Sequence, residues 1–247
     1  MTQAIILAAG RGSRLKNMTS YKPKSFNKFN KKRYIDIIIE NFLKNNLKKI
    51  NIVVGYKKKL FERYKYKKLF NSKWKSSSIF FSLYKANKIL SNESCIISYS
   101  DIIFKKSAIK LLKESKGEIV ILNNSNWKKT WKLRFKKPLK DLESFDYSKN
   151  SKGFYLTKIG SKVKNISQIK GQFAGLFKIT PRGWKIIIDF IKKEKLNIKN
   201  IDMTSFFSKL IKKHNNVVKV VHYNKMWFEI DTVKDFKLLN SYKIKFL

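Results

Sequence analysis

The chain has 247 residues, of which 43% are hydrophobic and 14% aromatic, and this composition excludes an intrinsically disordered protein. Its formal net charge of +41, from 57 Lys and Arg against 16 Asp and Glu, is typical of nucleic-acid-binding proteins. The lysines are nevertheless spread along the whole chain beside abundant Asn, Ile and Phe, as A/T-rich codons produce. We therefore expect nonspecific, salt-dependent attraction to polyanions, with a non-catalytic polyanion-binding protein as one alternative.

Apolar runs and helical patterns alternate along the chain. Strands are predicted at the apolar runs 4–8, 50–55, 94–99, 118–122, 154–158 and 217–222. Helices are predicted where apolar residues repeat at helical spacing, at 34–47, 107–116, 182–194 and 202–213. This alternation favours an α/β fold with a mostly parallel, doubly wound sheet in a single domain of residues 1–247. The less regular stretch 123–171 is expected to be an insertion that carries substrate-binding groups.

The first predicted strand opens into a loop of small residues. Gly and Ala let backbone N–H groups approach an anion closely, and Arg11 and Arg14 add forked donors for phosphate oxygens. The Walker A and dinucleotide-binding patterns are excluded, because both need a glycine where Leu15 stands. A tight turn that binds nothing is the alternative. We expect a nucleotide triphosphate site that comprises Leu7, Ala8, Ala9, Gly10, Arg11, Gly12, Ser13, Arg14 and Lys24.

Acidic residues follow two further apolar stretches. Asp101 comes after the run 94–99, at the end of a buried strand, where α/β sheets bind ligands. Near the end of the chain, strand alternation puts Glu229 and Asp231 on one face. Carboxylates in these places suit magnesium (Mg²⁺), a hard cation that prefers oxygen ligands. For Asp101 and Asp231 the alternative is a helix N-cap without a ligand.

The opening loop, together with Pro23-Lys24, resembles the L-A-A-G-x-G-[ST]-R-L … P-K signature of nucleotidyltransferases that join NTPs to phosphorylated small molecules. The resemblance implies a Rossmann-like three-layer fold of the nucleotide-diphospho-sugar transferase type. It also implies that Asp231, in a W-x-E-I-D pattern, is a second metal ligand beside Asp101, with Glu229 as a weaker candidate. Arg14 is expected to hold the departing phosphates and Lys24 to stabilise charge on the α-phosphate.

A second stretch, Asn71 to Ser78 followed by Ser82-Leu83, is similar to the N-x-x-[YW]-x-x-T-N-x-x-x-S-L stretch of bacterial cytidylyltransferases. These include the phosphocholine and aminoethylphosphonate enzymes. Ser77 and Ser78 stand where those relatives have the Thr and Asn near the nucleotide, so the hydroxyls are kept and the amide is lost. A serine-rich loop without a ligand is the alternative.

The segments 127–143, 171–178 and 202–206 resemble most closely the phosphoglutamine cytidylyltransferases, which start the phosphoramidate decoration of bacterial surface polysaccharide. On this resemblance Arg134 holds the acceptor phosphate, while Trp127 and Trp131 form the walls of its pocket. Two tryptophans buried in the core are the alternative. The further acceptor-side candidates are Lys162, Gln172 and Glu229.

We therefore expect a Mg²⁺-dependent enzyme that transfers a cytidylyl group from CTP to the phosphate of a small polar acceptor and releases pyrophosphate. The acceptor phosphate is already anionic, so no catalytic histidine is needed. Enzymes that use phosphocholine, a phosphonate or a sugar 1-phosphate are the alternatives.

The remaining expectations concern location and assembly. The only cysteine, Cys95, excludes an internal disulfide and lies in an apolar run, which predicts a buried thiol rather than a nucleophile. No apolar stretch approaches the roughly 18 residues of a membrane-spanning helix, and basic residues of a signal peptide are missing from the start. We expect a cytoplasmic protein without membrane insertion. The late apolar helix around 184–191 suits packing against a second copy in a homodimer.

Overall fold

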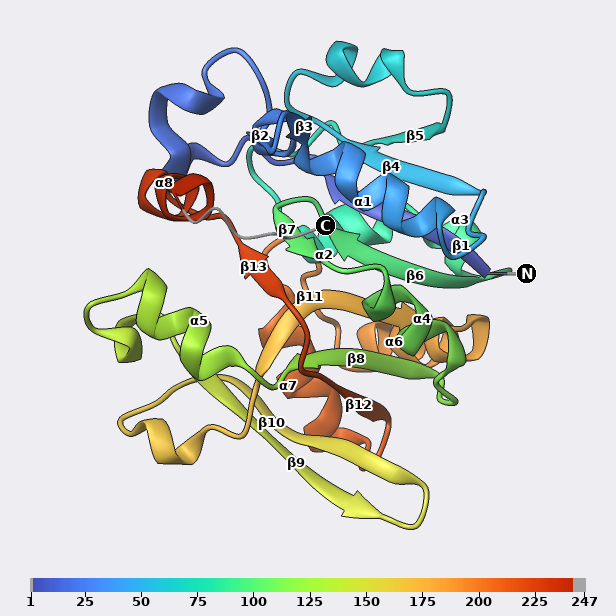
Figure 1. The fold of residues 1–247 in the computed structure, drawn as a ribbon. Coiled ribbons are helices and arrows are strands. Elements are labelled where there is room, and N and C mark those ends of the chain that lie inside the picture. Colours follow the sequence, from blue (N-terminus) through green and yellow to red (C-terminus); the bar gives the residue numbers. More distant parts are fainter. Residues whose placement is uncertain (1, 242–247) are drawn as a thin grey trace.

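A mixed nine-stranded sheet forms the centre of the computed structural model, which describes residues 2–241. In chain order its strands are β1 (Thr2–Ala8), β4 (Ile50–Val54), β5 (Lys67–Phe70), β6 (Ser94–Tyr99), β8 (Ile119–Asn124), β9 (Glu143–Asn150), β10 (Gly153–Lys162), β11 (Gln172–Ile179) and β12 (Val218–Tyr223). Across the sheet the order is β5-β4-β1-β6-β11-β8-β12-β10-β9 (Figure 1). Strands β10 and β11 run against the other seven. The predicted mixed, mostly parallel sheet is confirmed.

The central strands are apolar on both faces, and this explains why the sequence shows them as continuous runs rather than alternating patterns. Strand β1 pairs in parallel with β4 on one side and β6 on the other, so that Ala4 lies opposite both Ile50 and Ile96. The side chains of all three residues are buried. Because β1, β4 and β6 are parallel, the loops that follow them all leave from the same edge of the sheet.

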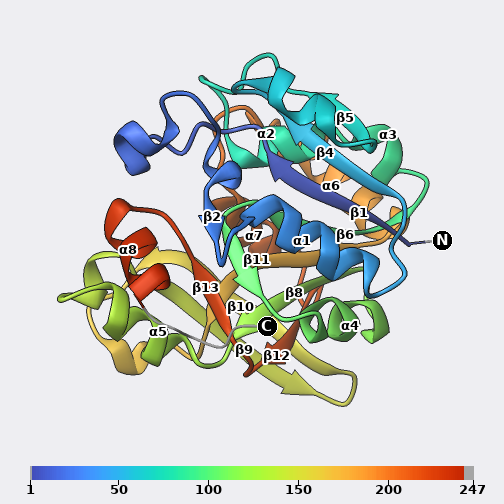
Figure 2. The ribbon, with the colours of Figure 1, turned by 45° about the horizontal axis from the view of Figure 1, so that its top comes forward.

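Eight helices lie among the described residues: α1 (Tyr34–Leu43), α2 (Ile79–Tyr84), α3 (Asn87–Leu90), α4 (Ser107–Glu114), α5 (Trp127–Arg134), α6 (Pro181–Lys193), α7 (Met203–Lys213) and α8 (Val233–Ser241). Helices α1 and α4 cover one face of the sheet, and α2, α6 and α7 cover the other (Figures 1 and 2). The 3-10 helices are η1 (Ser13–Thr19), η2 (Lys24–Phe26), η3 (Lys58–Arg63), η4 (Pro138–Lys140) and η5 (Ile166–Gln168). The layers are those of a three-layer α/β fold.

Helix α1 ends earlier than its apolar pattern predicts. Asn46 has a left-handed backbone with φ of 61°, and the N–H of Leu47 donates to the carbonyl of Phe42 at 3.0 Å. This is the hydrogen bonding of a Schellman motif, in which a left-handed residue closes the helix. The apolar side chain of Leu47 is therefore buried beyond the helix end rather than within the helix.

The stretch 123–171 contains the end of β8, helix α5 and the β9–β10 hairpin, which extends the sheet beside β12. Helix α5 contacts α8 near the carboxyl edge of the sheet (Figure 2). The role of this stretch as a substrate-binding insertion stays a prediction.

The buried residues of helix α6 pack within the protein. Trp184, Ile187 and Phe190 are all buried within the protein, and the indole N–H of Trp184 donates to Oδ1 of Asn87 at 2.7 Å. The core thus accounts for these three residues, and the packing of this helix against a second copy stays a prediction. Over residues 2–241, no helix has the length and hydropathy needed to span a bilayer.

Two short strands outside the main sheet join distant parts of the chain. Strand β7 (Ile102–Phe104) pairs antiparallel with β13 (Trp227–Glu229), so that Ile102 lies opposite Glu229. The N–H of Ile230 donates to the carbonyl of Asp101 at 2.9 Å. This pairing fixes the segment after β6 beside the segment after β13. A second small pair, β2 (Lys28–Phe29) with β3 (Lys32–Arg33), precedes α1.

Candidate active site

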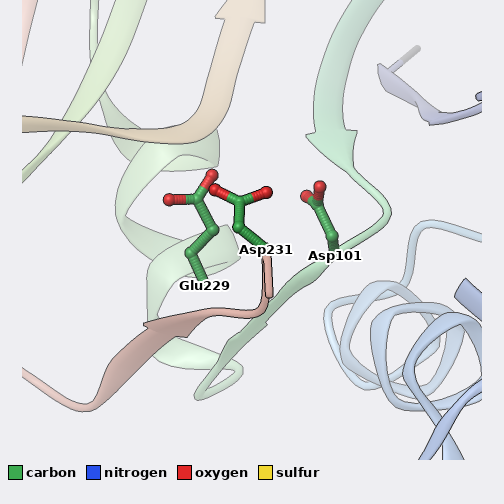
Figure 3. A group of neighbouring side chains, drawn as sticks. All are labelled: Asp101, Glu229 and Asp231. Atoms are coloured by element: carbon green, nitrogen blue, oxygen red, sulfur yellow. The ribbon is translucent and has the colours of Figure 1, made fainter. Parts of the chain in front are cut away.

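Three carboxylates converge at the carboxyl edge of the sheet. Asp101 follows β6, Glu229 ends β13, and Asp231 lies two residues further along. Figure 3 shows the three side chains pointing to the same side, and one oxygen from each lies within 4.8 Å of one oxygen of the other two. The β7–β13 pairing holds them there, since it joins the two segments from which they come.

Lys24 lies between two of these acids. Its ammonium is 2.7 Å from Oδ2 of Asp101 and 2.8 Å from Oδ1 of Asp231, and its side chain is 10% exposed. Burial lowers the pKa of Lys24, but the two carboxylates raise it by more, so that the net pKa lies well above its ordinary value. Lys24 is therefore a permanent cation of the site.

The glycine turn after β1 packs directly against Lys24. Gly12 has a φ of 77°, and a Cβ added to it would lie 2.5 Å from Cβ of Lys24. The N–H of Lys24 also donates to the carbonyl of Arg11 at 3.1 Å. Glycine thus serves twice here, because its backbone is left-handed and because Lys24 leaves no space for a side chain.

The two late acids differ in their electrostatics. Burial raises the pKa of Asp231, but Lys24 and Arg14 lower it by more, and the net pKa is below its ordinary value. Nη2 of Arg14 is 2.8 Å from Oδ1 of Asp231. Burial and the neighbouring Asp231 raise the pKa of Glu229, and Arg134 offsets this only in part. Asp231 is thus held as a carboxylate, whereas the charge on Glu229 is disfavoured.

Arg134 does not fit the expected role as the ligand of an acceptor phosphate. Its side chain is fully buried, with Nε 2.9 Å from Asp235, Nη1 3.1 Å from Glu229 and Nη2 3.5 Å from Asp231. Every side of the guanidinium therefore faces a carboxylate. The partners of Arg134 in the structure are three acids of the protein.

Neither Asp101 nor Asp231 caps a helix. At the start of α8 the hydroxyl of Thr232 accepts from the N–H of Asp235 at 3.2 Å, and Oδ2 of Asp235 accepts from the N–H of Thr232 at 2.9 Å. This reciprocal pair is a capping box. The N-cap position of α4 is occupied by Lys106. The carboxylates of Asp101 and Asp231 remain available to the acid cluster.

A cavity of about 180 Å³ lies beside the glycine turn. Seven of the residues predicted to bind the nucleotide line it: Leu7, Ala9, Gly10, Gly12, Lys24, Ser77 and Ser78. Ala8, Arg11 and Ser13 do not. Nε of Arg11 donates instead to the carbonyl of Thr19 at 3.3 Å. Arg14 lines the neighbouring cavity.

The serine loop has structural contacts of its own. The hydroxyl of Ser78 caps α2 by accepting from the N–H of Phe81 at 3.1 Å, and Ser77 accepts from the side chain of Asn71 at 3.1 Å. Trp74, to which the sequence analysis gave no role, also lines the cavity. Trp74 occupies the aromatic position of the N-x-x-[YW] motif, and this match could have identified it as a residue of the site.

A larger cavity of about 340 Å³ lies on the other side of the acid cluster, and Ile79 lines both cavities. Of the predicted acceptor-side residues, Trp131, Gln172 and Glu229 line it. Trp127 is buried in the main hydrophobic core, as the alternative interpretation has it, and Lys162 is exposed on β10. Neither residue lines this cavity.

This larger cavity is rich in acids that the sequence analysis did not assign. Asp141, Glu143 and Asp202 line it, and none of them forms an ion pair with any cation of residues 2–241. Burial raises the pKa of Asp141 and Glu143. Burial raises the pKa of Asp202 as well, but its hydrogen bonds to Ser205 and Thr204 lower it by more. In a strongly basic chain, the cavity thus carries a surplus of negative charge.

The family model of the MobA-like NTP transferase domain matches residues 4–152. The chain belongs to this family. Within it, the chain is 32% identical to the CTP:phosphoglutamine cytidylyltransferase of Campylobacter jejuni, over 95% of this chain and 98% of that protein. It is also 43% identical to the choline-phosphate cytidylyltransferase of Streptococcus pneumoniae over 63 residues, which are 26% of this chain and 28% of that protein.

Solved structures of NTP transferases share the fold of this family member. The inositol-1-phosphate CTP transferase from T. maritima superimposes with a TM-score of 0.75 at 22% identity, covering 99% of this chain and 97% of that one. The CTP:phosphocholine cytidylyltransferase from S. pneumoniae gives a TM-score of 0.67 at 22% identity, covering 97% and 98%. The expected Rossmann-like nucleotidyltransferase fold is therefore confirmed.

Proposed function

We propose that the protein transfers a cytidylyl group from CTP to the phosphate of a small acceptor of the phosphoglutamine type, with release of pyrophosphate. The observation that carries the proposal is the position of the acid cluster between two cavities, one beside the glycine turn and one lined by acids. The similarity to a CTP:phosphoglutamine cytidylyltransferase over nearly the whole chain supports it.

The acid cluster fits Mg²⁺. Its donors are carboxylate oxygens, which this cation prefers. Oδ1 of Asp101 is buried and has no hydrogen-bond partner among residues 2–241, so this oxygen is free to coordinate a cation. Asp101 and Asp231 would hold the ion, with Glu229 as a third ligand. When bound, the ion neutralises charge on the phosphates that react.

In the proposed reaction an oxygen of the acceptor phosphate attacks the α-phosphorus of CTP. The bond between the α-phosphorus and the bridging oxygen breaks, and pyrophosphate leaves with the electron pair. The attacking oxygen is anionic at neutral pH, so no general base is required. Lys24 lies beside the acid cluster and would stabilise charge on the α-phosphate. Arg14 is largely exposed and pairs with Asp231. It lines the larger cavity, so its role towards the departing phosphates stays a prediction.

The acids of the larger cavity favour an acceptor that is cationic at its other end. Asp141, Glu143 and Asp202 form no ion pair among the described residues, so an ammonium group that enters the cavity would be attracted by all three. Phosphoglutamine, phosphocholine and aminoethylphosphonate carry such a group. Inositol 1-phosphate and glucose 1-phosphate have no cationic group, so the acids of the cavity would not attract them. We therefore place the acceptor among the ammonium-bearing compounds.

The test is a panel of four NTPs against these five acceptors, with pyrophosphate release as the readout. We expect release with CTP and at least one ammonium-bearing acceptor, and the highest kcat/KM with phosphoglutamine. The Asp101→Asn variant provides the control for contaminating activity. Absence of release with every combination would refute the proposed function.

The same preparation tests the polyanion-binding alternative. The net charge of +41 predicts binding to DNA at low salt whatever the enzymatic activity. We expect this binding to disappear by about 200 mM salt, because it depends on released counterions. Tight, sequence-selective binding that persists at that salt concentration would favour the alternative.

A further inference from the structure

Arg134 is a buried arginine in a protein whose basic residues are mostly at the surface. Its side chain has no exposed area, although it carries a permanent charge. Three acids surround it: Glu229 and Asp231 of the cluster, and Asp235 of α8. A buried charge is retained only when it is paired and hydrogen-bonded. These acids are therefore what holds it inside.

The surroundings of Arg134 fix its orientation. The guanidinium carbon lies 5.3 Å from the ring centre of Trp131 and 4.9 Å from that of Phe135. Lys234 of α8 donates to the backbone carbonyl of Arg134 at 2.6 Å. The guanidinium is thus held between two aromatic rings and attached to α8. It cannot turn towards either cavity without breaking its contacts with three acids.

The cluster needs a cation at this position. One carboxylate oxygen from each of Asp101, Glu229 and Asp231 lies within 4.8 Å of one oxygen of the other two, and like charges repel at this distance. Lys24 pairs with Asp101 and with Oδ1 of Asp231. Arg134 pairs with Glu229 and with Oδ2 of the same Asp231. The two cations thus approach Asp231 through different oxygens, and Arg134 is the cation that pairs with Glu229.

We propose that Arg134 is a positioning residue, which holds Glu229 and Asp231 in the arrangement that binds the divalent cation. This proposal rests on one part of the proposed function, namely that the acid cluster binds the divalent cation. The planar fork of arginine is essential, because its separate N–H groups reach two carboxylates of the cluster and Asp235 at once. A lysine supplies one compact charge and cannot bridge them in this geometry.

The experiment compares Arg134→Lys with the wild type and with Arg33→Lys. Arg33 also lies over an aromatic ring and near an acid, Phe26 and Asp36, but its ion pair does not involve the cluster. Mn²⁺ binding is measured by electron paramagnetic resonance with a non-hydrolysable CTP analogue present. In parallel, pyrophosphate release is followed while Mg²⁺ is varied. Thermal melting of each variant reports folding.

For Arg134→Lys we expect Mn²⁺ affinity to fall, and the Mg²⁺ concentration for half-maximal velocity to rise, by about tenfold each. At saturating Mg²⁺ the KM for the acceptor should change less than twofold. Arg33→Lys should match the wild type. A raised acceptor KM with unchanged Mn²⁺ affinity would overturn the proposal in favour of phosphate binding. A lower melting temperature with unchanged Mn²⁺ affinity would overturn it in favour of a purely structural role.

A second variant covers the case in which Arg134→Lys does not fold. Asp235→Asn removes one partner of Arg134 without altering any residue of the cluster. Its amide oxygen can still accept the hydrogen bonds that cap α8. We expect Mn²⁺ affinity to fall by a few fold, and an affinity equal to the wild type would count against the proposal. Failure of the wild type itself to release pyrophosphate would refute the proposed function, but not the Mn²⁺ result.

Discussion

The ammonium of Lys24 lies 2.8 Å from Oδ1 of Asp231, although 207 positions separate the two residues in the chain. Asp101 joins them from a third segment, since its Oδ2 is 2.7 Å from the same ammonium. The first, middle and last parts of the chain thus meet in a single cluster of charges. Removing one of these charges should affect the other two.

Lys24→Met should destabilise the protein, because it leaves two closely spaced carboxylates without their shared cation. Breaking a buried ion pair from one side costs about 3–5 kcal/mol, and Lys24 is only 10% exposed. Denaturant unfolding measures the loss, with exposed Lys185→Met as the matched control. Addition of Mg²⁺ should raise the melting temperature of Lys24→Met more than that of the wild type. Equal stabilisation of both by Mg²⁺ would contradict the metal assignment.

Asp101→Asn should remove most of the activity while the fold is retained. The substitution keeps size and shape but removes the charge from one member of the cluster. We expect kcat to fall on the order of 100-fold, equivalent to about 3 kcal/mol of transition-state stabilisation. Pyrophosphate release measures the rate, and circular dichroism checks the fold. Undiminished turnover would exclude Asp101 from the site.

Gly12→Ala should reduce both stability and activity. The new Cβ would lie 2.5 Å from Cβ of Lys24, and the backbone has a φ of 77°. Relief of the contact must move Lys24, which pairs with Asp101 and Asp231. Gly10→Ala is the control for folding, because a Cβ there meets nothing within 4 Å. A melting temperature for Gly12→Ala equal to that of Gly10→Ala would contradict this interpretation of the turn.

Glu143→Gln should stabilise the protein at neutral pH. Burial raises the pKa of Glu143, and Asp202 and Asp141 raise it further, while Thr204 lowers it. The ionised form is therefore disfavoured in the fold, and this cost appears as the pH rises above the ordinary pKa of 4.5. Thermal melting of the variant and the wild type should coincide near pH 4 and diverge towards pH 8. If the variant were less stable than the wild type at pH 8, the ionised Glu143 would be stabilising, which contradicts this prediction.

The same substitution separates stability from function. Under the proposed function, Glu143→Gln should raise the KM for an ammonium-bearing acceptor about tenfold and leave the KM for CTP unchanged. The two effects together would place Glu143 among residues whose unfavourable charge is kept for binding. An unchanged acceptor KM would remove Glu143 from the acceptor site.

Cys95 should react slowly with alkylating reagents in the folded protein. Burial, together with Glu93, raises the pKa of its thiol to about 12. At pH 8 this leaves about a thousandfold less thiolate than an ordinary thiol with a pKa of 9. Mass spectrometry after iodoacetamide treatment should show labelling only in denaturant. Rapid labelling of the native protein would contradict the burial predicted from the sequence.

The fold was largely predictable because its signals are local. Continuous apolar runs such as Ala4–Ala8 are typical of strands covered on both faces, and the glycine turn follows the first of them in the sequence. The W-x-E-I-D motif predicted Asp231, the loop signature predicted Lys24, and the end of the apolar run 94–99 predicted Asp101. The structure brings their side chains together. The catalytic roles of these residues stay predictions.

The partners of Arg134 and the acids of the larger cavity could not be predicted in the same way. Arg134 is one basic residue among 57, and only the folded chain reveals that Glu229, Asp231 and Asp235 surround it. Glu143 lies at the start of β9, and Asp202 precedes α7, where it has the ordinary appearance of an N-cap. Their shared cavity depends on how β9 and α7 pack, which no single segment encodes.

The packing of α5 against β13 has an optical consequence. The indoles of Trp131 and Trp227 are stacked 5.8 Å apart with an angle of 3° between their planes. Chromophores so close couple their excited states, so a change in their relative orientation should alter the ultraviolet circular dichroism. Trp131 also donates to Asp141 on the wall of the larger cavity. The protein therefore contains a native spectroscopic reporter that requires no dye to follow occupation of that cavity.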